Sequence, residues 1–420
     1  MQCVKINYFR GKIGGIVELP PSKSESNRAL IIRALSGNNF NINNLSDAKD
    51  TSVLIDILYK IKNRKSFDDI EVLDVGAAGS VMRFLSAFLC LQKGKWLLTG
   101  DQRMQQRPIK VLVDGLNQIG AKIYYVNKDG FPPIIIESQK INISNITIDS
   151  SISSQYISAL LMIAPFLNKG LKINVEEAVV SLPYIIMTLK MLEYFGIINI
   201  YKRESITIKH QKFKAKDITI NYDWSAASYF YEVIAISEIG SEIFLKGLKK
   251  DSLQGDEIVA DIFIKLGVST IIQDDGIRII KNKQSISKFS FDFTHYPDIA
   301  QTMIVCCAAL GIKGEFYGLE SLAIKETNRI LALQKELVKL GCVVRIIDNG
   351  SMLLSGNVNI YINPIIVNTY NDHRMAMAFA PLALKTGVVF IENPKIVNKS
   401  YTKFWENIAK IGFELNENDK

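Results

Sequence analysis

A pattern of about 73 residues recurs along the chain, and this repeat restricts the possible folds more than any other feature. Each copy has a turn of polar or small residues followed by a run of apolar residues with helical character. The turns are anchored at Ser24, Gly79, Ser153, Ser225, Asp298 and Asp372. Successive anchors lie 55, 74, 72, 73 and 74 residues apart, which predicts six copies of one structural unit.

A second series of residues repeats with similar spacing. Amphipathic helical patterns end in Gly, and strand-like runs such as Ala121–Val126, Ile197–Tyr201 and Val343–Ile347 follow. The glycines are Gly120, Gly196, Gly267, Gly341 and Gly412, spaced 76, 71, 74 and 71 residues apart. Gly commonly ends a helix because it enters the left-handed region without a Cβ penalty. Asp-Gly and Asn-Gly turns close several of the runs.

Together the two series predict a unit of strand, buried helix, strand, amphipathic helix and two further strands. One such βαβαββ unit is too small to bury a core alone, so three packed units would form one domain and six would form two. The short first step predicts that the first unit has lost an element. The expected core helices are Ala29–Leu35, Phe84–Leu91, Ile157–Phe166, Ala227–Ile236, Met303–Leu310 and Met375–Leu384.

The composition is that of an ordinary soluble globular chain. Of 420 residues, 48% are hydrophobic, and the net charge of +8 includes no run of five basic residues, so we expect no nucleic-acid partner. The longest apolar stretch, near Ile157–Leu167, has about half the length of a bilayer-spanning helix. Met1–Arg10 lacks the pattern of a secretory signal, and five irregularly spaced cysteines favour a reducing compartment. We therefore expect a cytoplasmic protein that does not enter a membrane.

The starts of the core helices are the expected location of the chemistry. A helix N-terminus attracts anions, and several of these starts carry Lys or Arg. The segment Ser22-Lys-Ser-Glu-Ser-Asn-Arg28 is the clearest case, although it is not a P-loop. The three histidines are far apart in the sequence, which argues against a His-based metal site. The pattern therefore predicts a metal-free site for phosphates and carboxylates.

Four further segments carry a recognisable family pattern. They are Asp101-Gln-Arg-Met-Gln-Gln-Arg107-Pro108-Ile109, Ser153-Ser154-Gln155, Lys325-Glu326-Thr327-Asn328-Arg329 and Tyr370-Asn-Asp-His-Arg-Met-Ala-Met377. With the Ser22–Arg28 segment, this set resembles the 5-enolpyruvylshikimate-3-phosphate synthase family, from Leu19 to Trp405. The resemblance implies a two-domain inside-out α/β barrel with six βαβαββ repeats, three per domain, and an active site in the interdomain cleft. It places residues 20–223 in one domain, and the N-terminal strand, Met1–Leu19, with 224–420 in the other.

The resemblance also implies the reaction. The family transfers the enolpyruvyl group of phosphoenolpyruvate to the 5-hydroxyl of shikimate 3-phosphate and releases phosphate. The product forms by addition and elimination through a tetrahedral intermediate, without a metal or organic cofactor. Addition needs a base for the hydroxyl and an acid for the enol methylene. The implied partners are these two small anions, and the implied state is a monomer.

The resemblance implies a role for each matched residue. Asp298 is the expected proton acceptor, Glu326 the proton donor, and Lys23 a catalytic contact to both substrates. The residues expected at shikimate 3-phosphate are Lys23, Ser24, Arg28, Ser153, Ser154, Gln155, Ser181, Tyr184, Asp298, Ser321 and Lys325. Those expected at phosphoenolpyruvate are Lys23, Gly79, Arg107, Gln155, Arg329, Arg374 and Lys399. The herbicide glyphosate, which occupies the phosphoenolpyruvate subsite in this family, is the expected inhibitor.

Each assignment has a purely structural alternative. Ser153 and Ser154 could serve only as helix N-caps, and Glu326 with Arg329 could be an ordinary i,i+3 ion pair. Lys399 lies in a lysine-rich region. The sequence also departs from the family at four positions: Ala77 replaces an Asn, Leu182 a Lys, Ser321 an Asn or similar polar residue, and Asn328 an Asp.

Two other functions remain open at this point. UDP-N-acetylglucosamine enolpyruvyl transferase shares the repeats and the use of phosphoenolpyruvate. It typically carries a reactive Cys near the position of Arg107, and Gln102–Arg107 contains none. A non-catalytic anion-binding scaffold of the same fold is the second alternative, against which Asp298, Glu326 and Lys23 argue.

Overall fold

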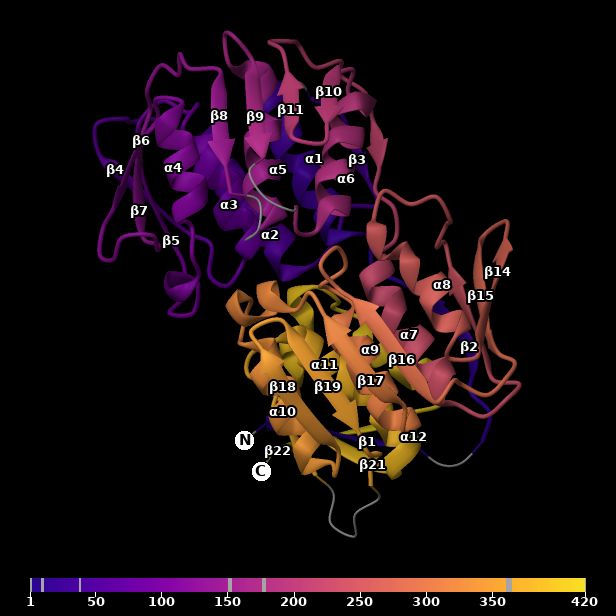
Figure 1. Cartoon of the computed structure of the whole chain (residues 1–420). Helices are drawn as coiled ribbons and strands as arrows, with labels where there is room; N and C mark the ends of the chain where they lie inside the picture. Colours follow the sequence, from indigo (N-terminus) through magenta and orange to yellow (C-terminus); the bar gives the residue numbers. More distant parts are fainter. Residues whose placement is uncertain are drawn as a thin grey trace. The chain divides into compact units, whose positions relative to one another are not determined.

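The computed structural model describes residues 2–8, 11–37, 39–149, 153–175, 179–359 and 365–419. The chain forms two compact units, which Figure 1 colours along the sequence. Unit 1 comprises Met1–Pro21 and Asn221–Lys420, and unit 2 comprises Ser22–Ile220. The chain therefore passes between the units twice. The boundaries at 22 and 220 lie within three residues of the 20 and 223 that we expected.

One repeat of unit 2 illustrates the unit of structure. Strands β4 (Ile70–Asp74) and β5 (Lys95–Thr99) pair in parallel around helix α3 (Gly79–Leu89). Helix α4 (Lys110–Gln118) then leads into β6 (Lys122–Tyr125) and β7 (Ile134–Glu137). The sheet order is β4-β5-β7-β6, with antiparallel pairing of β5 to β7 and of β6 to β7. This is the predicted βαβαββ unit.

The same sheet order recurs three times. The second repeat of unit 2 contains β8 (Asn145–Ile148), α5 (Ser154–Ile163), β9 (Leu171–Val175), α6 (Leu182–Tyr194), β10 (Asn199–Lys202) and β11 (Ser205–Ile208). In unit 1, one repeat contains β2 (Gly14–Glu18), α7 (Trp224–Ile236), β13 (Glu242–Lys246), α8 (Val259–Ile264), β14 (Val268–Gln273) and β15 (Gly276–Lys281). The next contains β16 (Lys288–Asp292), α9 (Ala300–Leu310), β17 (Lys313–Tyr317), α10 (Arg329–Lys339), β18 (Val343–Asp348) and β19 (Ser351–Ser355).

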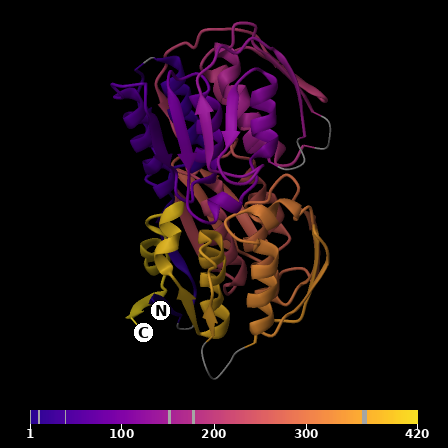
Figure 2. The same ribbon diagram turned by 90° about the vertical axis from the view of Figure 1, so that its left-hand side faces the viewer.

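The last repeat takes one strand from the other end of the chain. It contains β20 (Ile366–Val367), α11 (His373–Phe379), α12 (Ala383–Thr386), β21 (Val388–Glu392), α13 (Phe404–Lys410) and β22 (Glu414–Asp419). Its fourth strand is β1 (Gln2–Asn7), which pairs antiparallel with both β21 and β22. Figures 1 and 2 accordingly show the two termini side by side.

The N-terminal segment differs from the expectation in one respect. We expected one strand over Met1–Leu19, whereas the structure has β1 and β2 in different sheets. Strand β2 pairs in parallel with β13 of unit 1. Gly11 lies between the two strands, and Met1, Phe9 and Arg10 lie outside the described residues.

The first repeat is reduced, as the short first step predicts. It contains α1 (Lys23–Ser36), β3 (Ile42–Asn43) and α2 (Lys49–Lys62), and its sheet has only the two strands β12 (Ile218–Thr219) and β3. In the fully described stretch 39–149, α2 is followed directly by β4 of the next repeat. The element that this repeat lacks is therefore the closing pair of strands.

The five predicted helix-ending glycines all have a positive φ. The values are 102°, 83°, 84°, 90° and 105° for Gly120, Gly196, Gly267, Gly341 and Gly412. They follow α4, α6, α8, α10 and α13 respectively. This conformation favours glycine, and it confirms the interpretation of these residues as helix ends.

The predicted apolar helices form the cores of both units. In unit 1, α7, α9 and α11 are almost entirely buried, together with inward-facing residues of the three sheets. In unit 2, α3 and α5 are buried to a similar extent. The expected helix Met375–Leu384 begins two residues earlier, at His373, and is divided by a 3-10 turn at Ala380–Leu382. Within the described parts of the chain, no helix combines the length and apolar character needed to cross a bilayer.

Candidate active site

The first turns of the core helices bring charged residues of unit 1 together. Asp372 caps α11, and its Oδ1 accepts a hydrogen bond of 2.9 Å from the backbone N–H of Arg374. Asn328 caps α10 by accepting from the N–H of Leu331, so that Arg329 is the first helical residue. The Asn that departs from the family pattern therefore still performs the capping role of an acidic residue.

Six charged residues of unit 1 contact one another, and we call them the unit 1 cluster: Asp298, Glu326, Arg329, Asp372, Arg374 and Lys399. Arg329 lies at its centre with a side-chain exposure of 2%. Its Nε is 2.7 Å from Asp372 Oδ2, its Nη2 is 2.9 Å from Glu326 Oε2, and its Nη1 is 3.7 Å from Asp298 Oδ1. One guanidinium thus contacts carboxylates from three separate segments of the chain.

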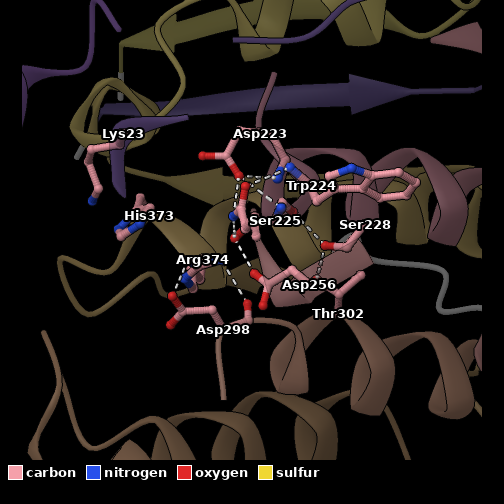
Figure 3. A network of polar contacts seen from close by, with 12 residues as sticks. Lys23, Asp223, Trp224, Ser225, Ser228, Asp256, Asp298, Thr302, His373 and Arg374 are labelled. Atoms are coloured by element: carbon pink, nitrogen blue, oxygen red, sulfur yellow. Dashed lines mark hydrogen bonds and ion pairs between the residues drawn. The ribbon is translucent and has the colours of Figure 1, made fainter. Parts of the chain in front are cut away.

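Asp298 and Arg374 form a second ion pair in the unit 1 cluster. Arg374 Nη2 lies 3.0 Å from Asp298 Oδ2, and Nη1 donates to the Asp298 carbonyl at 2.7 Å. The same Nη1 lies 3.4 Å from the hydroxyl of Tyr229. Figure 3 shows this pair, with Asp256 next to it. Because Arg374 binds both the side chain and the backbone of Asp298, the two residues have a fixed mutual orientation.

Glu326 links the remaining cation to the cluster. Its Oε1 lies 3.2 Å from Nζ of Lys399, the last residue of the 3-10 helix η6 (Pro394–Lys399). The side-chain exposures are 12% for Glu326 and 5% for Lys399. Glu326 and Arg329 also form the i,i+3 ion pair that was considered as an alternative to a catalytic role. The further pairing with Lys399 places that contact within a larger group of charges.

The charges of the unit 1 cluster balance. Three carboxylates face three cations, and most of these side chains are buried, which strengthens their mutual attraction. Burial by itself lowers the pKa of Arg329, but Asp372 and Glu326 outweigh that effect and raise it. A bound anion must therefore compete with carboxylates for these cations, and a carboxyl that loses contact with a cation becomes free to take up a proton.

Two expected ligands lie on the segment before α10. Ser321 belongs to the 3-10 helix η4 (Glu320–Ile324), is 8% exposed, and its Oγ has no hydrogen-bond partner among the described residues. A buried hydroxyl without a partner is uncommon in native proteins and is consistent with a ligand-binding role. Lys325 follows in an extended conformation and is partly exposed.

In unit 2, Lys23 lies at the first residue of α1. Its Nζ is 2.9 Å from Oδ2 of Asp50, which lies in the first turn of α2. The side chains are 18% and 6% exposed. Asn27, one turn further along α1, links the helix starts: its side-chain amide donates to Ser80 Oγ of α3 and accepts from Thr51 Oγ1 of α2. The starts of α1, α2 and α3 are thus tied together around Lys23.

Arg28 is the most deeply embedded of the expected ligands. Its Nε donates to Thr188 Oγ1 at 2.7 Å, and Nη2 donates to Ser158 Oγ at 3.1 Å and to the Tyr184 carbonyl. Nη1 donates to the carbonyl of Ser24. Burial lowers the pKa of Arg28 to about 10. The structure therefore gives Arg28 a structural role that joins α1 to α5 and α6, which the sequence did not predict.

Gly79 and Arg107 are direct neighbours in unit 2. Gly79 is the first residue of α3, and Arg107 follows the 3-10 helix η1 (Met104–Gln106) and is 6% exposed. A Cβ at Gly79 would lie 2.6 Å from Nη1 and 2.8 Å from Nη2 of Arg107. Gly79 is not among the glycines with positive φ, so the close approach of the guanidinium is the reason that it needs to lack a side chain.

The serine-rich segments of unit 2 begin helices. Ser153 is the N-cap of α5, and its Oγ accepts from the N–H of Gln155, while Ser154 is 5% exposed. Ser181 precedes α6 with a left-handed backbone (φ 56°), and the ring of Tyr184 lies 6.0 Å from the Arg28 guanidinium carbon. Ser153 is therefore an N-cap, which agrees with the alternative that it has a structural role rather than a ligand-binding one. Capping leaves the hydroxyl's second lone pair and its proton available.

The roles of three carboxylates were not predicted from the sequence: Asp50 and Asp372 contact the expected ligands Lys23 and Arg329, and Asp256 contacts Ser225 at the start of α7. Asp372 lies inside a recognised motif, and its position before a helix was a usable signal for an N-cap. Asp50 and Asp256 had no such signal, because their partners Lys23 and Ser225 are 27 and 31 residues away in the chain. Among the described residues, no group of three His, Cys, Asp or Glu side chains is arranged to hold a metal ion.

Comparisons with known proteins are consistent along the whole chain. Residues 9–408 match the family described as EPSP synthase (3-phosphoshikimate 1-carboxyvinyltransferase). The chain is similar to proteins of that name from Bacteroides fragilis (strain YCH46), at 44% identity over 96% of this chain and 97% of that protein, and from Buchnera aphidicola subsp. Cinara cedri, at 37% identity over 97% and 96%.

A solved structure gives the same result for the fold. An EPSP synthase from Acinetobacter baumannii matches with a TM-score of 0.78, covering 99% of this chain and 100% of that one at 20% identity. The sequence match extends over nearly all of the chain, and the repeated architecture agrees with it. The chain therefore belongs to the EPSP synthase family.

Proposed function

We propose that this chain transfers the enolpyruvyl group of phosphoenolpyruvate to the 5-hydroxyl of shikimate 3-phosphate and releases phosphate. The reaction belongs to the shikimate pathway and to aromatic amino acid biosynthesis. Family membership supports the reaction. The unit 1 cluster is the observation that supports assigning the reaction to particular residues. Three buried cations and two partly exposed carboxyls, Asp298 and Glu326, supply the charge and the proton-transfer groups that this chemistry needs.

The cations of the unit 1 cluster are the proposed contacts to phosphoenolpyruvate. Arg329, Arg374 and Lys399 are all at least nine-tenths buried and lie among carboxylates that fix their positions. From unit 2 we assign Lys23, Gly79, Arg107 and Gln155 to the same substrate. Fixed cations of this kind stabilise negative charge without needing to reorganise when the reaction occurs.

Shikimate 3-phosphate takes a more polar set of residues. From unit 2 this set contains Lys23, Ser24, Arg28, Ser153, Ser154, Gln155, Ser181 and Tyr184. From unit 1 it contains Asp298, Ser321 and Lys325. Hydroxyls and amides suit the ring hydroxyls of this substrate, whereas the lysines suit its phosphate. The unpartnered Oγ of Ser321 supports its inclusion.

Asp298 and Glu326 have distinct proposed roles in the proton transfers. Asp298 accepts the proton of the 5-hydroxyl, and its pairing with Arg374 keeps its carboxylate oriented. Glu326 donates a proton to the enol methylene. Its two oxygens contact Arg329 and Lys399, which hold the carboxyl among the proposed contacts to phosphoenolpyruvate.

One assay tests the function against both alternatives. The purified protein is incubated with phosphoenolpyruvate and with either shikimate 3-phosphate or UDP-N-acetylglucosamine, and the released phosphate is measured. We expect release only with shikimate 3-phosphate, and Asp298→Asn serves as the inactive control. Release with the nucleotide sugar would support the other transferase, and binding of both anions without any release would support the non-catalytic scaffold.

A further inference from the structure

The motif Tyr370–Met377 contains two residues, Tyr370 and Asn371, that the proposed function does not use. Both have a left-handed backbone, with φ of 53° and 56°. Left-handed conformations are unfavourable for residues other than glycine, and Tyr is a poor residue for this region because of its bulk. The next residue is Asp372, the N-cap of α11, and Arg374 follows in the first turn. An unfavourable turn therefore leads directly into a cation of the unit 1 cluster.

A buried carboxylate holds this turn in place. Glu336 in α10 is completely buried, and its Oε1 accepts a hydrogen bond of 2.5 Å from the hydroxyl of Tyr370. Its Oε2 accepts from the backbone N–H of Asn368 at 3.2 Å. Lys339 Nζ lies 2.7 Å from both oxygens and supplies the counter-charge. Hydrogen bonds to a charged acceptor are among the stronger ones in proteins.

Helix α10 contacts the segment Asn368–Asp372 at two points. At its start, Arg329 donates to both oxygens of Asp372, at 2.7 and 3.3 Å. Two turns later on the same face, Glu336 holds Tyr370 and Asn368. The Asn371 side chain accepts from Asn393 Nδ2 at 3.1 Å, but that contact is exposed. The buried contact of Tyr370 is consequently the stronger constraint on the turn.

We propose that Glu336 and Tyr370 are positioning residues, which hold the left-handed Tyr370–Asn371 turn and thereby place Arg374 for binding phosphoenolpyruvate. This inference rests on the proposed role of Arg374. Neither residue needs to touch a substrate. Their effect passes through the turn to Asp372, which orients Arg329 and fixes the first turn of α11. A displacement of about 1 Å at such a group can reduce a rate about a hundredfold.

Tyr370→Phe is the decisive variant, because it removes one hydroxyl and leaves the ring. Glu336 keeps Lys339 and the Asn368 N–H as partners, so no buried charge is left alone. We expect the KM for phosphoenolpyruvate to rise about tenfold and the KM for shikimate 3-phosphate to change less than about twofold. Tyr317→Phe is the matched control, because Tyr317 also donates to a glutamate, Glu315 at 3.0 Å, on the exposed face of strand β17.

A second substitution separates positioning from general destabilisation. Asn371→Gly removes the backbone penalty at the second residue of the turn. Added to Tyr370→Phe, it should restore part of the lost affinity for phosphoenolpyruvate, whereas a merely loosened protein would not recover. If Tyr370→Phe is poorly soluble, Glu336→Gln, which keeps an acceptor oxygen, is measured in its place with the same expected split between the two KM values.

Arg374→Lys distinguishes failure of this inference from failure of the proposed site. If Arg374→Lys raises the KM for phosphoenolpyruvate but Tyr370→Phe changes only the melting temperature, the positioning role of Glu336 and Tyr370 is wrong and the role of Arg374 stands. If Arg374→Lys leaves that KM unchanged, the assignment of Arg374 fails and the inference fails with it. An equal rise of both KM values in Tyr370→Phe would also contradict positioning of Arg374 alone.

Discussion

The guanidinium of Arg107 covers the α-carbon of Gly79 so closely that a Cβ on Gly79 would be 2.6 Å from Nη1. Real Cβ atoms do not approach other heavy atoms to this distance, so the side chain of Arg107 has to move in a Gly79→Ala variant. Arg107 is 6% exposed, which limits where it can go. This contact gives the substitution a defined physical effect on a proposed phosphoenolpyruvate cation.

Gly79→Ala should weaken the binding of glyphosate more than tenfold, which corresponds to more than about 1.4 kcal/mol. Binding of phosphoenolpyruvate should weaken as well, but less, because glyphosate is longer and leaves less room for a displaced Arg107. Both constants and the melting temperature are measured on the same variant. An unchanged ratio of the two constants with a lower melting temperature would contradict the prediction.

Lys23→Met should reduce turnover at least about a hundredfold, since it removes a cation that is expected to contact both substrates. The substitution also leaves the carboxylate of Asp50, which is 6% exposed, without its ion-pair partner. The double variant Lys23→Met with Asp50→Asn should therefore regain thermal stability but not turnover. Lys60→Met, which removes an exposed lysine paired with Glu71, is the control and should keep full activity. Near-normal turnover of Lys23→Met would reject the assignment.

Asp298→Asn and Glu326→Gln should each lower turnover by about 10²–10⁴-fold, the usual cost of losing a general base or acid. Calorimetry should show that both variants still bind shikimate 3-phosphate. Glu242→Gln is a suitable control, because Glu242 forms a 2.6 Å ion pair with Arg278 and both side chains are partly exposed. If Glu326→Gln kept full turnover, Glu326 would serve only to hold Arg329 and Lys399.

Asp256 should make the stability of the protein depend on pH. Burial and the nearby carboxylate of Asp298 raise its pKa from the usual 3.8 to about 7. Between these two values the unfolded chain has released the proton that the folded protein still holds, so stability falls as the pH rises through this window. Asp256→Asn removes this dependence. The melting temperature of Asp256→Asn minus that of the unmodified protein should therefore become more positive by a few degrees when the pH is raised from 5 to 8.

Asp217→Asn is the control for this measurement. Hydrogen bonds from Asn41 lower the pKa of Asp217, so this residue stays ionised from pH 5 to pH 8. The melting-temperature difference caused by its substitution should not vary across that range. A pH-independent difference for Asp256→Asn would contradict the proposed titration of Asp256.

Much of the fold was predictable because its signals are local. Helix ends such as Gly267 and Gly341 follow from backbone sterics, and the buried helices follow from their composition. The pairing of β1 with β21 and β22 has no local signal, since the two ends of the chain meet there. The family resemblance supplied the membership of the N-terminal segment in unit 1, but not its division into β1 and β2.

The site was predictable in its residue types and less so in its contacts. The cations Arg329 and Arg374 belong to motifs, whereas their grouping with Asp298 and Asp372 depends on three helix starts that are distant in the sequence. Arg28 shows the limit of such motifs. Its many internal hydrogen bonds come from α5 and α6, more than 100 residues away, so a structural role could not be read from the Ser22–Arg28 segment.

The strand pairing of the N-terminal segment constrains the order in which the chain can fold during synthesis. Unit 2 is one continuous stretch, Ser22–Ile220, and domains generally fold as units in the order in which they are synthesised. Strand β2 has to wait for β13 at Glu242–Lys246, and β1 has to wait for β21 and β22 at the opposite terminus. The first strand to be made therefore acquires its partners last, and a nascent chain that stops before β21 leaves β1 exposed to mispairing or to capture by a chaperone.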